Sequence, residues 1–260
     1  MALPIYQVDA FTGELFAGNP AAVVPLENWL PSEVMQKIAF ENNLSETAFY
    51  VQTPEGLAIR WFTPAVEVNL CGHATLASGF VVFHRGEVTG DLVEFSSRSG
   101  PLRVRREGEL LVLDFPAHAP QPTPAPRGLI EAMGLAPREV WRADEDYLVL
   151  YASEAEVRGL APDFARLETV EARGVIATAP GSGVDFVSRF FAPRVGVPED
   201  PVTGSAHTRL TPYWAGRLGK NELTARQVSK RGGWLQCRQR GDRVEIAGRA
   251  VLYMTGTIAV

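Results

Sequence analysis

The sequence predicts an α+β fold of two pseudo-symmetric halves. Each half is expected to be a curved mixed β-sheet wrapped around a central helix, with the active site in the cleft between the halves. Three observations predict this class. A nine-residue pattern recurs half a chain apart, a proline-rich segment separates two β-rich stretches, and each stretch contains one helical segment introduced by a glycine.

The internal repeat is the most informative of these observations. Residues 60–68 read R-W-F-T-P-A-V-E-V, and residues 189–197 read R-F-F-A-P-R-V-G-V. Arg, Phe, Pro and both Val coincide at an offset of 129 residues in a chain of 260. Chance similarity over nine residues is the alternative. The offset of half the length favours an ancestral duplication into two domains over a solenoid, which needs more and shorter repeats.

A domain boundary is expected at residues 115–127, F-P-A-H-A-P-Q-P-T-P-A-P-R, where five prolines alternate with other residues. Such a segment is extended and semi-rigid. The predicted domains are residues 1–116 and residues 128–260, joined by a linker at 117–127. The last strand is left free to return to the N-terminal half.

Three helices are expected. One runs from Pro31-Ser32 to about Glu41, with Ser32 as its N-cap. Residues 74–83, A-T-L-A-S-G-F-V-V-F, are apolar on nearly every side, which places that helix inside the sheet. The matching segment, residues 206–218, contains Pro212, which predicts a kink.

Short β-rich runs account for most of the remaining chain. The expected strands are residues 5–8, 48–51, 58–62, 92–95, 102–105 and 110–114 in the first half, and 140–142, 147–151, 174–178, 185–191, 228–230, 234–238, 244–247 and 251–257 in the second. Polar turns at 105–109 and 240–242 predict antiparallel hairpins.

Composition excludes several classes of protein. Apolar residues make up 46% of the chain and charged residues 21%, which rules out a disordered chain and a coiled coil. The net charge of −5 gives no basic field for nucleic acid. The sequence shows no apolar run long enough to span a membrane and no secretion signal at its start. Two cysteines suit a reducing compartment, so a cytoplasmic protein is expected.

Both central helices begin at a glycine-led loop, L-C-G-H-A-T around Gly72 and V-T-G-S-A-H around Gly204. Free N–H groups and the positive end of the helix dipole make such a loop an anion receptor. Two facing receptors would hold a carboxylate or an enolate-like oxyanion of a small substrate. Glycines that only permit close packing of helix on sheet are an equally good interpretation.

Two carboxylates are candidates for acid–base chemistry. Glu46 stands beside Ala-Phe-Tyr at the start of a strand, where partial desolvation would raise its pKa towards neutrality. A solvated acid in a loop is the alternative, and composition alone favours it. Asp200, in E-D-P-V-T-G-S, either caps the helix that begins near Gly204 or points into the cleft.

His73 and Cys71 flank the first receptor glycine. His73 could hydrogen-bond or protonate a substrate, although a single histidine is more often a packing residue. Cys71 precedes a helix N-terminus, which favours the thiolate, although a buried inert cysteine is the commoner case. The four histidines show no metal-binding spacing, so no metal is expected.

Four separated motifs resemble the PhzF family of phenazine biosynthesis-like proteins, which share the diaminopimelate epimerase fold. They are V-D-A-F-T…F-A-G-N-P-A-A-V from Val8, N-L-S-E-T-A-F from Asn43, F-T-P…C-G-H-A-T-L-A from Phe62 and E-D-P-V-T-G-S-A-H from Glu199. The resemblance covers nearly the whole chain and supports the duplicated fold.

The resemblance implies a cofactor-independent isomerase in which Glu46 takes a proton from one substrate carbon and returns it to another. It places assisting residues at His73, Asp200 and Ser205, the backbone anion site at Gly72 and Gly204, and Asn19 along the cleft. It also implies a homodimer. The substrate would resemble trans-2,3-dihydro-3-hydroxyanthranilate, but nothing in the sequence selects this compound over another small carboxylate.

Two other functions remain open. The epimerase branch of the fold uses one thiol from each half. Cys71 fills the first thiol position, but D-P-V-T-G-S has no cysteine and Cys237 lies well downstream. A racemase or epimerase using Cys71 is therefore one alternative. A ligand- or protein-binding member of the fold without catalysis is the other.

Overall fold

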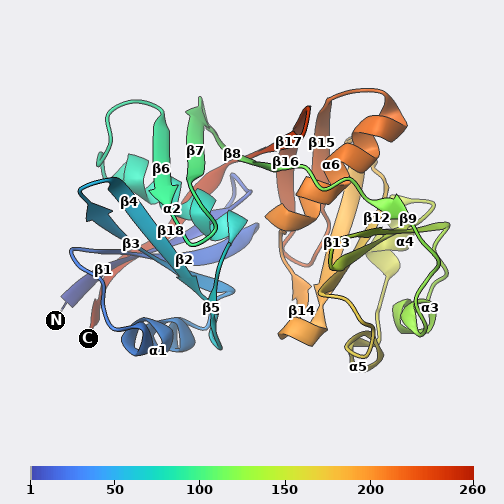
Figure 1. Cartoon of the computed structure of the whole chain (residues 1–260), viewed down its shortest axis with the longest axis horizontal. Coiled ribbons are helices and arrows are strands. Elements are labelled where there is room, and N and C mark those ends of the chain that lie inside the picture. The colour runs from blue at the N-terminus through green and yellow to red at the C-terminus, as the bar shows by residue number, and fades with distance from the viewer. Residues whose placement is uncertain (1) are drawn as a thin grey trace. The chain divides into compact units, whose positions relative to one another are not determined.

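The computed structural model describes residues 2–260 and divides the chain into two compact units. Unit 1 combines the residues up to Asp114 with the C-terminal segment Ala247–Val260, and unit 2 is the continuous stretch Phe115–Ile246. The proline-rich residues 117–127 therefore belong to unit 2, where Gln121–Pro122 forms a short strand. Figure 1 labels the elements of both units.

Unit 1 contains two helices and a mixed set of strands. Its elements are β1 (Ala2–Ala10), β2 (Asn19–Leu26), α1 (Ser32–Asn42), β3 (Glu46–Thr53), β4 (Gly56–Phe62), β5 (Glu67–Val68), α2 (Gly72–His84), β6 (Leu92–Ser96), β7 (Leu102–Glu107), β8 (Leu110–Pro116) and β18 (Ala250–Ala259). The last strand, β18, pairs antiparallel with the first, β1.

Unit 2 repeats this order with additional short helices. Its elements are β9 (Gln121–Pro122), α3 (Leu129–Met133), β10 (Glu139–Ala143), β11 (Asp146–Leu150), α4 (Glu154–Gly159), α5 (Phe164–Leu167), β12 (Gly174–Pro180), β13 (Phe186–Ala192), η1 (Pro193–Val195), β14 (Val197–Asp200), α6 (Gly204–Leu218), β15 (Glu222–Gln227), β16 (Gly233–Arg240) and β17 (Arg243–Gly248).

The strands of the two units pair in the same pattern. In unit 1, β2 runs parallel to β3, β3 is antiparallel to β4, and β4 is parallel to β6. In unit 2, β11 runs parallel to β12, β12 is antiparallel to β13, and β13 is parallel to β15. The long helix stands at the same point in both series, α2 before β6 and α6 before β15. The repeated topology supports the duplication indicated by the nine-residue repeat.

The repeated arginine makes the same contact in each unit. Arg60 forms a two-pronged ion pair with Glu67, with N–O distances of 2.7 and 2.8 Å. Arg189 does the same with Glu199, at 2.7 and 2.9 Å. Each guanidinium also lies over the ring of the phenylalanine two positions later, Phe62 or Phe191. The arginine therefore ties each short strand, β5 or β14, to its neighbour.

The central helix α2 is buried on nearly every side, as its sequence predicts, and contacts β1, β2, β3, β7 and β18. It packs tightly against β7 at Gly79, where a Cβ atom added to the glycine would lie 2.6 Å from Val104 Cγ1. Only glycine leaves room for this approach. On the shorter helix α1, Met35, Ile38 and Ala39 pack into a second apolar cluster of unit 1.

One predicted cap is wrong. Pro31 is the N-cap residue of α1, and no side chain caps this helix. Ser32 is instead the first helical residue, and its hydroxyl accepts a hydrogen bond from Arg60 Nη2 at 2.8 Å. A long-range partner therefore takes the group that would otherwise have capped the helix.

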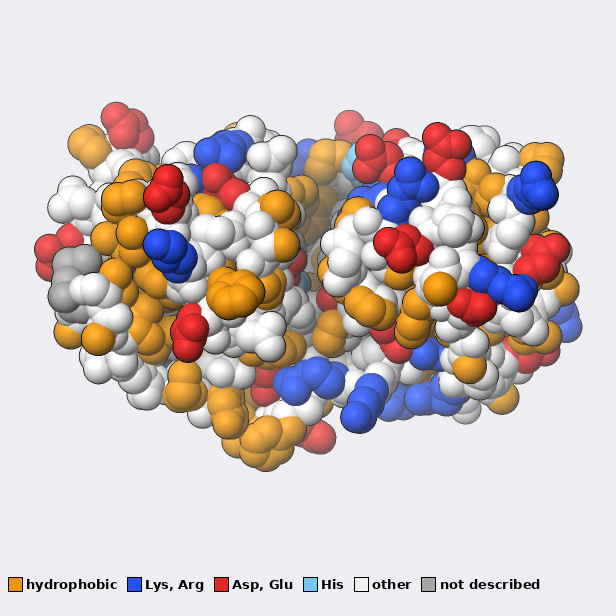
Figure 2. Space-filling model, turned by 90° about the horizontal axis from the view of Figure 1, so that it is seen from below, with side chains coloured by type: hydrophobic (Ala, Val, Ile, Leu, Met, Phe, Trp, Pro, Cys, Tyr) orange, Lys and Arg blue, Asp and Glu red, His pale blue; other side chains and the backbone are white. Residues whose placement is uncertain are grey.

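Acidic and basic side chains both occur across the face drawn in Figure 2, among hydrophobic and neutral residues. Among residues 2–260, no helix is both long enough and apolar enough to cross a membrane.

Candidate active site

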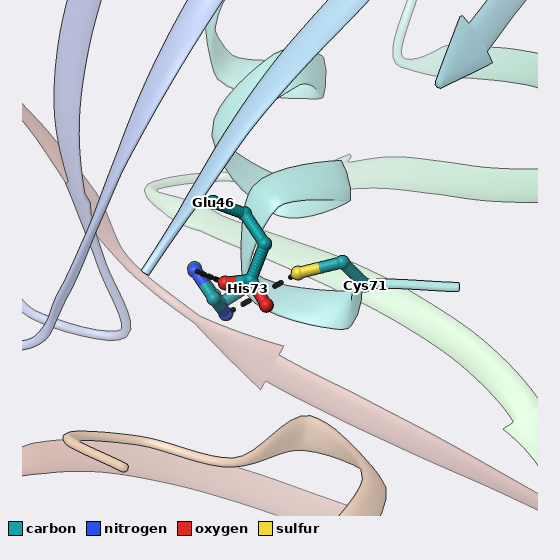
Figure 3. Close-up of side chains that lie close together, drawn as sticks. All are labelled: Glu46, Cys71 and His73. Atoms are coloured by element: carbon teal, nitrogen blue, oxygen red, sulfur yellow. Dashed lines mark hydrogen bonds and ion pairs between the residues drawn. The ribbon is translucent and has the colours of Figure 1, made fainter. Parts of the chain in front are cut away.

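In unit 1, three predicted site residues converge at the start of α2. Glu46 is the first residue of β3, Cys71 is the N-cap residue of α2, and His73 is the second residue of that helix. Glu46 Oε2 lies 3.2 Å from His73 Nε2, and Cys71 Sγ lies 3.5 Å from His73 Nδ1. Figure 3 shows the three side chains pointing toward one another.

Asn19 orients the imidazole from the opposite side. The Asn19 side chain is fully buried at the start of β2, and its Nδ2 donates to His73 Nδ1 at 3.2 Å. The Ser45 hydroxyl in turn donates to Asn19 Oδ1 at 3.2 Å. Because Nδ1 accepts, the ring proton of neutral His73 resides on Nε2, the nitrogen that faces Glu46. Ser45, Asn19 and His73 thus form a chain that ends at the Glu46 carboxylate.

His73 stays neutral at physiological pH. Only 5% of its surface is exposed, and burial lowers its pKa to about 3. Desolvation acts in this direction because it penalises the charged imidazolium. A neutral imidazole with its proton on Nε2 is a hydrogen-bond donor towards Glu46 and a weak base. Glu46 itself keeps 18% of its side chain exposed, which leaves it open to a ligand.

The first turn of α2 supplies an anion receptor beside this carboxylate. Cys71 has extended backbone angles and no capping side-chain hydrogen bond. The first helical hydrogen bond runs from the Thr75 N–H to the Cys71 carbonyl. The N–H groups of Gly72, His73 and Ala74 therefore lie outside the helix's own ladder. A carboxylate placed there would meet the positive end of the helix dipole.

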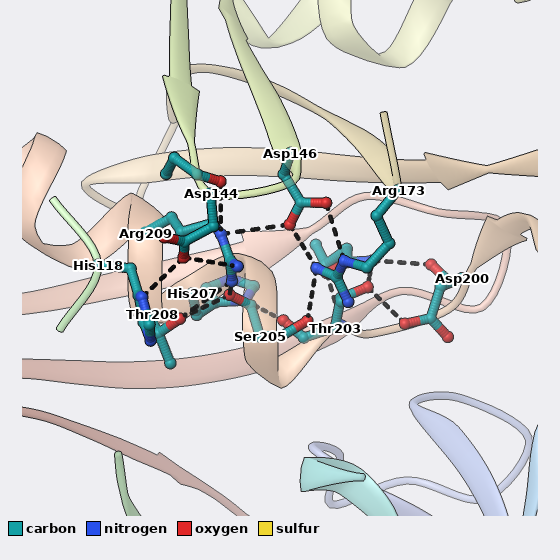
Figure 4. Close-up of polar contacts among 12 residues, drawn as sticks. His118, Asp144, Asp146, Arg173, Asp200, Thr203, Ser205, His207, Thr208 and Arg209 are labelled. Atoms are coloured by element: carbon teal, nitrogen blue, oxygen red, sulfur yellow. Dashed lines mark hydrogen bonds and ion pairs between the residues drawn. The ribbon is translucent and has the colours of Figure 1, made fainter. Parts of the chain in front are cut away.

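In unit 2, the predicted residues Gly204 and Ser205 form the equivalent first turn of α6. Figure 4 shows Ser205 among its polar neighbours. The Ser205 hydroxyl accepts a hydrogen bond from Arg173 Nη2 at 3.1 Å. Arg173 also forms a two-pronged ion pair with Asp146, whose surface is fully buried. A second guanidinium, that of Arg209, lies 3.2 Å from the same carboxylate. At this end of unit 2, two guanidiniums are therefore paired with the carboxylates of Asp144 and Asp146.

Asp200 does not cap α6. The N-cap residue is Thr203, and no side chain caps this helix. The Asp200 carboxylate instead accepts a short hydrogen bond from the Thr203 hydroxyl. Gln227 braces both residues, because its Nε2 donates to the Asp200 carbonyl at 2.7 Å and its Oε1 accepts from the Thr203 N–H at 2.9 Å. The loop before α6 is thereby held in one conformation.

The two first turns correspond position by position but carry different chemistry. Thr203 stands where Cys71 stands, and Ser205 where His73 stands. The N2 side chain of each helix contacts a group at the start of a parallel strand. In unit 1 that group is a carboxylate, Glu46, and in unit 2 it is a guanidinium, Arg173.

The structure brings together Asn19, Glu46, Cys71, Gly72 and His73 in unit 1. It brings together Asp200, Gly204 and Ser205 in unit 2. Sequence reasoning missed Ser45, Arg173 and Gln227. The internal repeat does not identify Arg173, because its offset of 129 residues pairs Arg173 with Leu44. The structure alone shows that Arg173 directly precedes β12 as Ser45 directly precedes β3.

Comparisons with known proteins agree with this architecture. The model of the phenazine biosynthesis-like protein family, PhzC-PhzF, matches residues 8–256. A Pseudomonas aeruginosa protein described as an uncharacterised isomerase is 56% identical over 258 residues, covering 99% of each chain. The crystal structure of a PhzF-family phenazine biosynthesis protein from Enterococcus faecalis superposes with a TM-score of 0.97 at 47% identity, covering 100% of both chains.

A more distant structure extends the likeness to the wider fold class. A predicted epimerase from Pseudomonas aeruginosa shares the fold with a TM-score of 0.77 at 19% identity, covering 99% of each chain. The predicted α+β, epimerase-like fold is thereby confirmed. From the family match and the close relatives it follows that the chain belongs to the PhzF family of phenazine biosynthesis-like proteins.

Proposed function

We propose that the protein is a cofactor-independent isomerase that moves a proton between two carbons of a small carboxylate, with Glu46 as the general base and acid. The observation that carries this proposal is the placement of Glu46. Its carboxylate lies 3.2 Å from the neutral imidazole of His73, which is itself held by Asn19. The anion receptor of α2 begins one residue before that imidazole.

The reaction can be written with this chain's own groups. A substrate carboxylate binds the N–H groups at the start of α2, which brings the adjacent carbon towards Glu46. Glu46 takes a proton from that carbon, and the electron pair of the broken C–H bond spreads into the conjugated system of the substrate. The helix N-terminus stabilises the negative charge that develops. Glu46 then returns the proton to a second carbon, so no atom is gained or lost.

His73 assists without competing for the proton. Because its pKa is lowered to about 3, it does not take up the proton that Glu46 carries. Its Nε2–H faces the Glu46 carboxylate, with 3.2 Å between Nε2 and Oε2. Asn19 and Ser45 hold this tautomer. In unit 2, Asp200, Gly204 and Ser205 remain predicted site residues, and Arg173 positions the Ser205 hydroxyl.

The test is proton exchange in D2O followed by NMR. Native protein is incubated with dihydrohydroxyanthranilate and a panel of amino and hydroxy acids, and spectra are read for deuterium at carbon and for isomerised product. Glu46→Gln should lower the rate by at least about 100-fold, because it removes the group that carries the proton. Its melting temperature should stay close to that of the native protein.

Glu41→Gln is the matched control, because Glu41 is an exposed carboxylate on α1 outside the site. It should leave the rate unchanged. Retention of more than a few per cent of native activity by Glu46→Gln would require a different base. Saturable binding of a carboxylate with neither exchange nor product would instead favour a binding protein on this fold.

A second candidate is a racemase or epimerase in which Cys71 carries one of the two protons. The contact that favours it is the 3.5 Å separation of Cys71 Sγ from His73 Nδ1, because it places the thiol beside the His73–Glu46 pair. Cys71→Ala separates the candidates. It should abolish racemisation under this mechanism and leave the Glu46-dependent isomerisation largely intact.

A further inference from the structure

The cluster of Glu46, Cys71 and His73 has the composition of a metal site. One potential ligand atom from each residue lies within 4.8 Å of the others. Cys71 is 7% exposed and His73 is 5% exposed, so two of the three ligands are already desolvated. The residues come from two elements, the start of β3 and the start of α2, which face each other in Figure 3.

The donor atoms select the class of ion. A thiolate, an imidazole nitrogen and a carboxylate oxygen are the three ligand types of protein-bound zinc. Hard ions such as Mg²⁺ and Ca²⁺ take oxygen ligands and avoid sulfur. Three protein ligands leave a fourth tetrahedral position open to water or to an anion. The set therefore fits a thiophilic divalent cation.

The distances fit the same ion. Zn–S and Zn–N bonds of about 2.3 and 2.1 Å in a tetrahedron separate sulfur from nitrogen by about 3.6 Å, and nitrogen from oxygen by about 3.4 Å. Cys71 Sγ and His73 Nδ1 are 3.5 Å apart, and His73 Nε2 and Glu46 Oε2 are 3.2 Å apart. An ion uses only one ring nitrogen, so one of these pairs binds as it stands. The third side chain then closes by rotation.

A second observation concerns the imidazole. Within the described part of the chain, the buried His73 Nε2 forms no aligned hydrogen bond, although Glu46 Oε2 is near. A buried polar atom without such a bond is costly. An ion bound to Nε2 removes that cost when the ring proton moves to Nδ1 and the Asn19 amide turns so that its oxygen accepts this proton.

We propose that Glu46, Cys71 and His73 form a binding site for a thiophilic divalent cation, with Zn²⁺ as the type ion, and that the bound ion switches off proton transfer. Binding replaces the Cys71 S–H bond by an S–Zn bond and releases that proton to solvent. The ion also occupies the Glu46 carboxylate, so the base is blocked. The inhibition rests on the function proposed above, whereas binding of the ion does not.

Binding is tested without reference to activity. Native protein is titrated with Co²⁺ under reducing conditions, and with Zn²⁺ in competition with a chromophoric chelator. One equivalent should bind, with a thiolate-to-cobalt charge-transfer band in the near ultraviolet. Cys71→Ala should abolish the band and weaken Zn²⁺ binding by at least about 100-fold. Millimolar Mg²⁺ should not displace the cobalt.

Two further variants serve as controls for the binding experiment. Cys237→Ala removes the other cysteine, which is buried and outside the cluster, and should leave binding unchanged. Glu46→Gln should keep the sulfur band but weaken affinity, and each variant's fold is checked by its melting curve. Absence of one-to-one binding by the native protein, or equal binding by Cys71→Ala, would overturn the site.

Inhibition is measured separately in the NMR assay. One equivalent of Zn²⁺ should lower the exchange rate by about 100-fold or more, with full recovery on adding a chelator. Tight Zn²⁺ binding with an unchanged rate of proton exchange would overturn the proposed inhibition but not the proposed metal site. Tight binding by a protein that exchanges no proton on any ligand it binds would instead refute the proposed isomerase function.

Discussion

His207 provides a direct test of the electrostatics of α6. The residue is fully buried, and its Nδ1 donates to the Thr203 carbonyl at 2.8 Å. Nε2 therefore carries the lone pair, and among residues 2–260 it has no hydrogen-bond partner. A proton there would meet no acceptor, and burial lowers the pKa of His207 to about 4. We predict that this histidine makes the protein less stable as the pH falls.

The direction and size of this pH effect on stability follow from the pKa of histidine in the unfolded chain and the pKa of His207 in the folded chain. An unfolded chain protonates histidine near pH 6.5, whereas the folded chain does so only near pH 4. Between these values the unfolded state binds more protons, so the free energy of unfolding decreases as the pH decreases. The stabilisation is complete above about pH 6.5 and is lost by about pH 4. Its total is about 3 kcal/mol.

The assay compares native protein with His207→Asn, whose amide nitrogen replaces the Nδ1 donor without titrating. Urea unfolding at pH 7, 6, 5 and 4 is followed by the fluorescence of Trp214, which stacks on Phe186 next to the histidine. The variant is expected to be less stable than the native protein at pH 7. The difference between their free energies of unfolding should shrink by about 3 kcal/mol by pH 4. The titration of groups that both proteins share contributes equally to both free energies of unfolding, so it cancels in their difference.

Thr211→Val is the matched control. It removes a buried hydroxyl of α6 that donates to the His207 carbonyl at 2.6 Å, and it adds no titratable group. Its loss of stability should be the same at every pH. A gap between native protein and His207→Asn that stays constant from pH 7 to pH 4 would refute the reasoning.

Three other predictions concern packing, thiol chemistry and buried charge. Gly79→Ala should lower the free energy of unfolding, measured by urea titration, by about 1–3 kcal/mol, because its Cβ would lie 2.6 Å from Val104 Cγ1. Val104→Ala in the same chain should recover part of this loss. No recovery in the double variant would argue against this contact. Burial raises the pKa of Cys237 to about 12, so an alkylating reagent followed by peptide mass spectrometry should modify it only as the chain unfolds. Fast labelling in the native state would contradict that environment. Arg173→Met should cost about 3 kcal/mol or more, because it leaves the fully buried Asp146 without its two-pronged partner, and Asp146→Asn should recover part of the loss in a double-mutant cycle.

The central helices and the repeat were predictable because their signals are local. An apolar run from residue 74 to 83 can only be a buried element, and α2 occupies Gly72–His84. The turns at 105–109 and 240–242 likewise match the joins between β7 and β8 and between β16 and β17. In contrast, the short helices α3, α4 and α5 and the strands β2, β5, β9, β14 and β15 were not predicted. The strand expected at 228–230 is wrong, because the strand ends at Gln227 and these residues form the bend that follows β15.

The details of the site depend on contacts that no short stretch of sequence records. The spacing of residues along the chain does not show that Glu46 lies beside Cys71 and His73, because Glu46 comes from a strand that begins 25 positions before Cys71. Ser32 had the right residue type for a cap, but Arg60 engages its hydroxyl. Both outcomes depend on tertiary pairing, which competes with and overrides local preference.

The pairing of β18 with β1 has a consequence for the nascent chain. Unit 2 is one continuous segment and can be completed while the C-terminus is still being synthesised. Unit 1 begins first, but β1 has only β2 as a neighbour until β18 has been synthesised. The other edge of β1 must therefore stay open while the whole of unit 2 is made. Chaperone demand and truncation sensitivity should accordingly concentrate in the half of the protein that is made first.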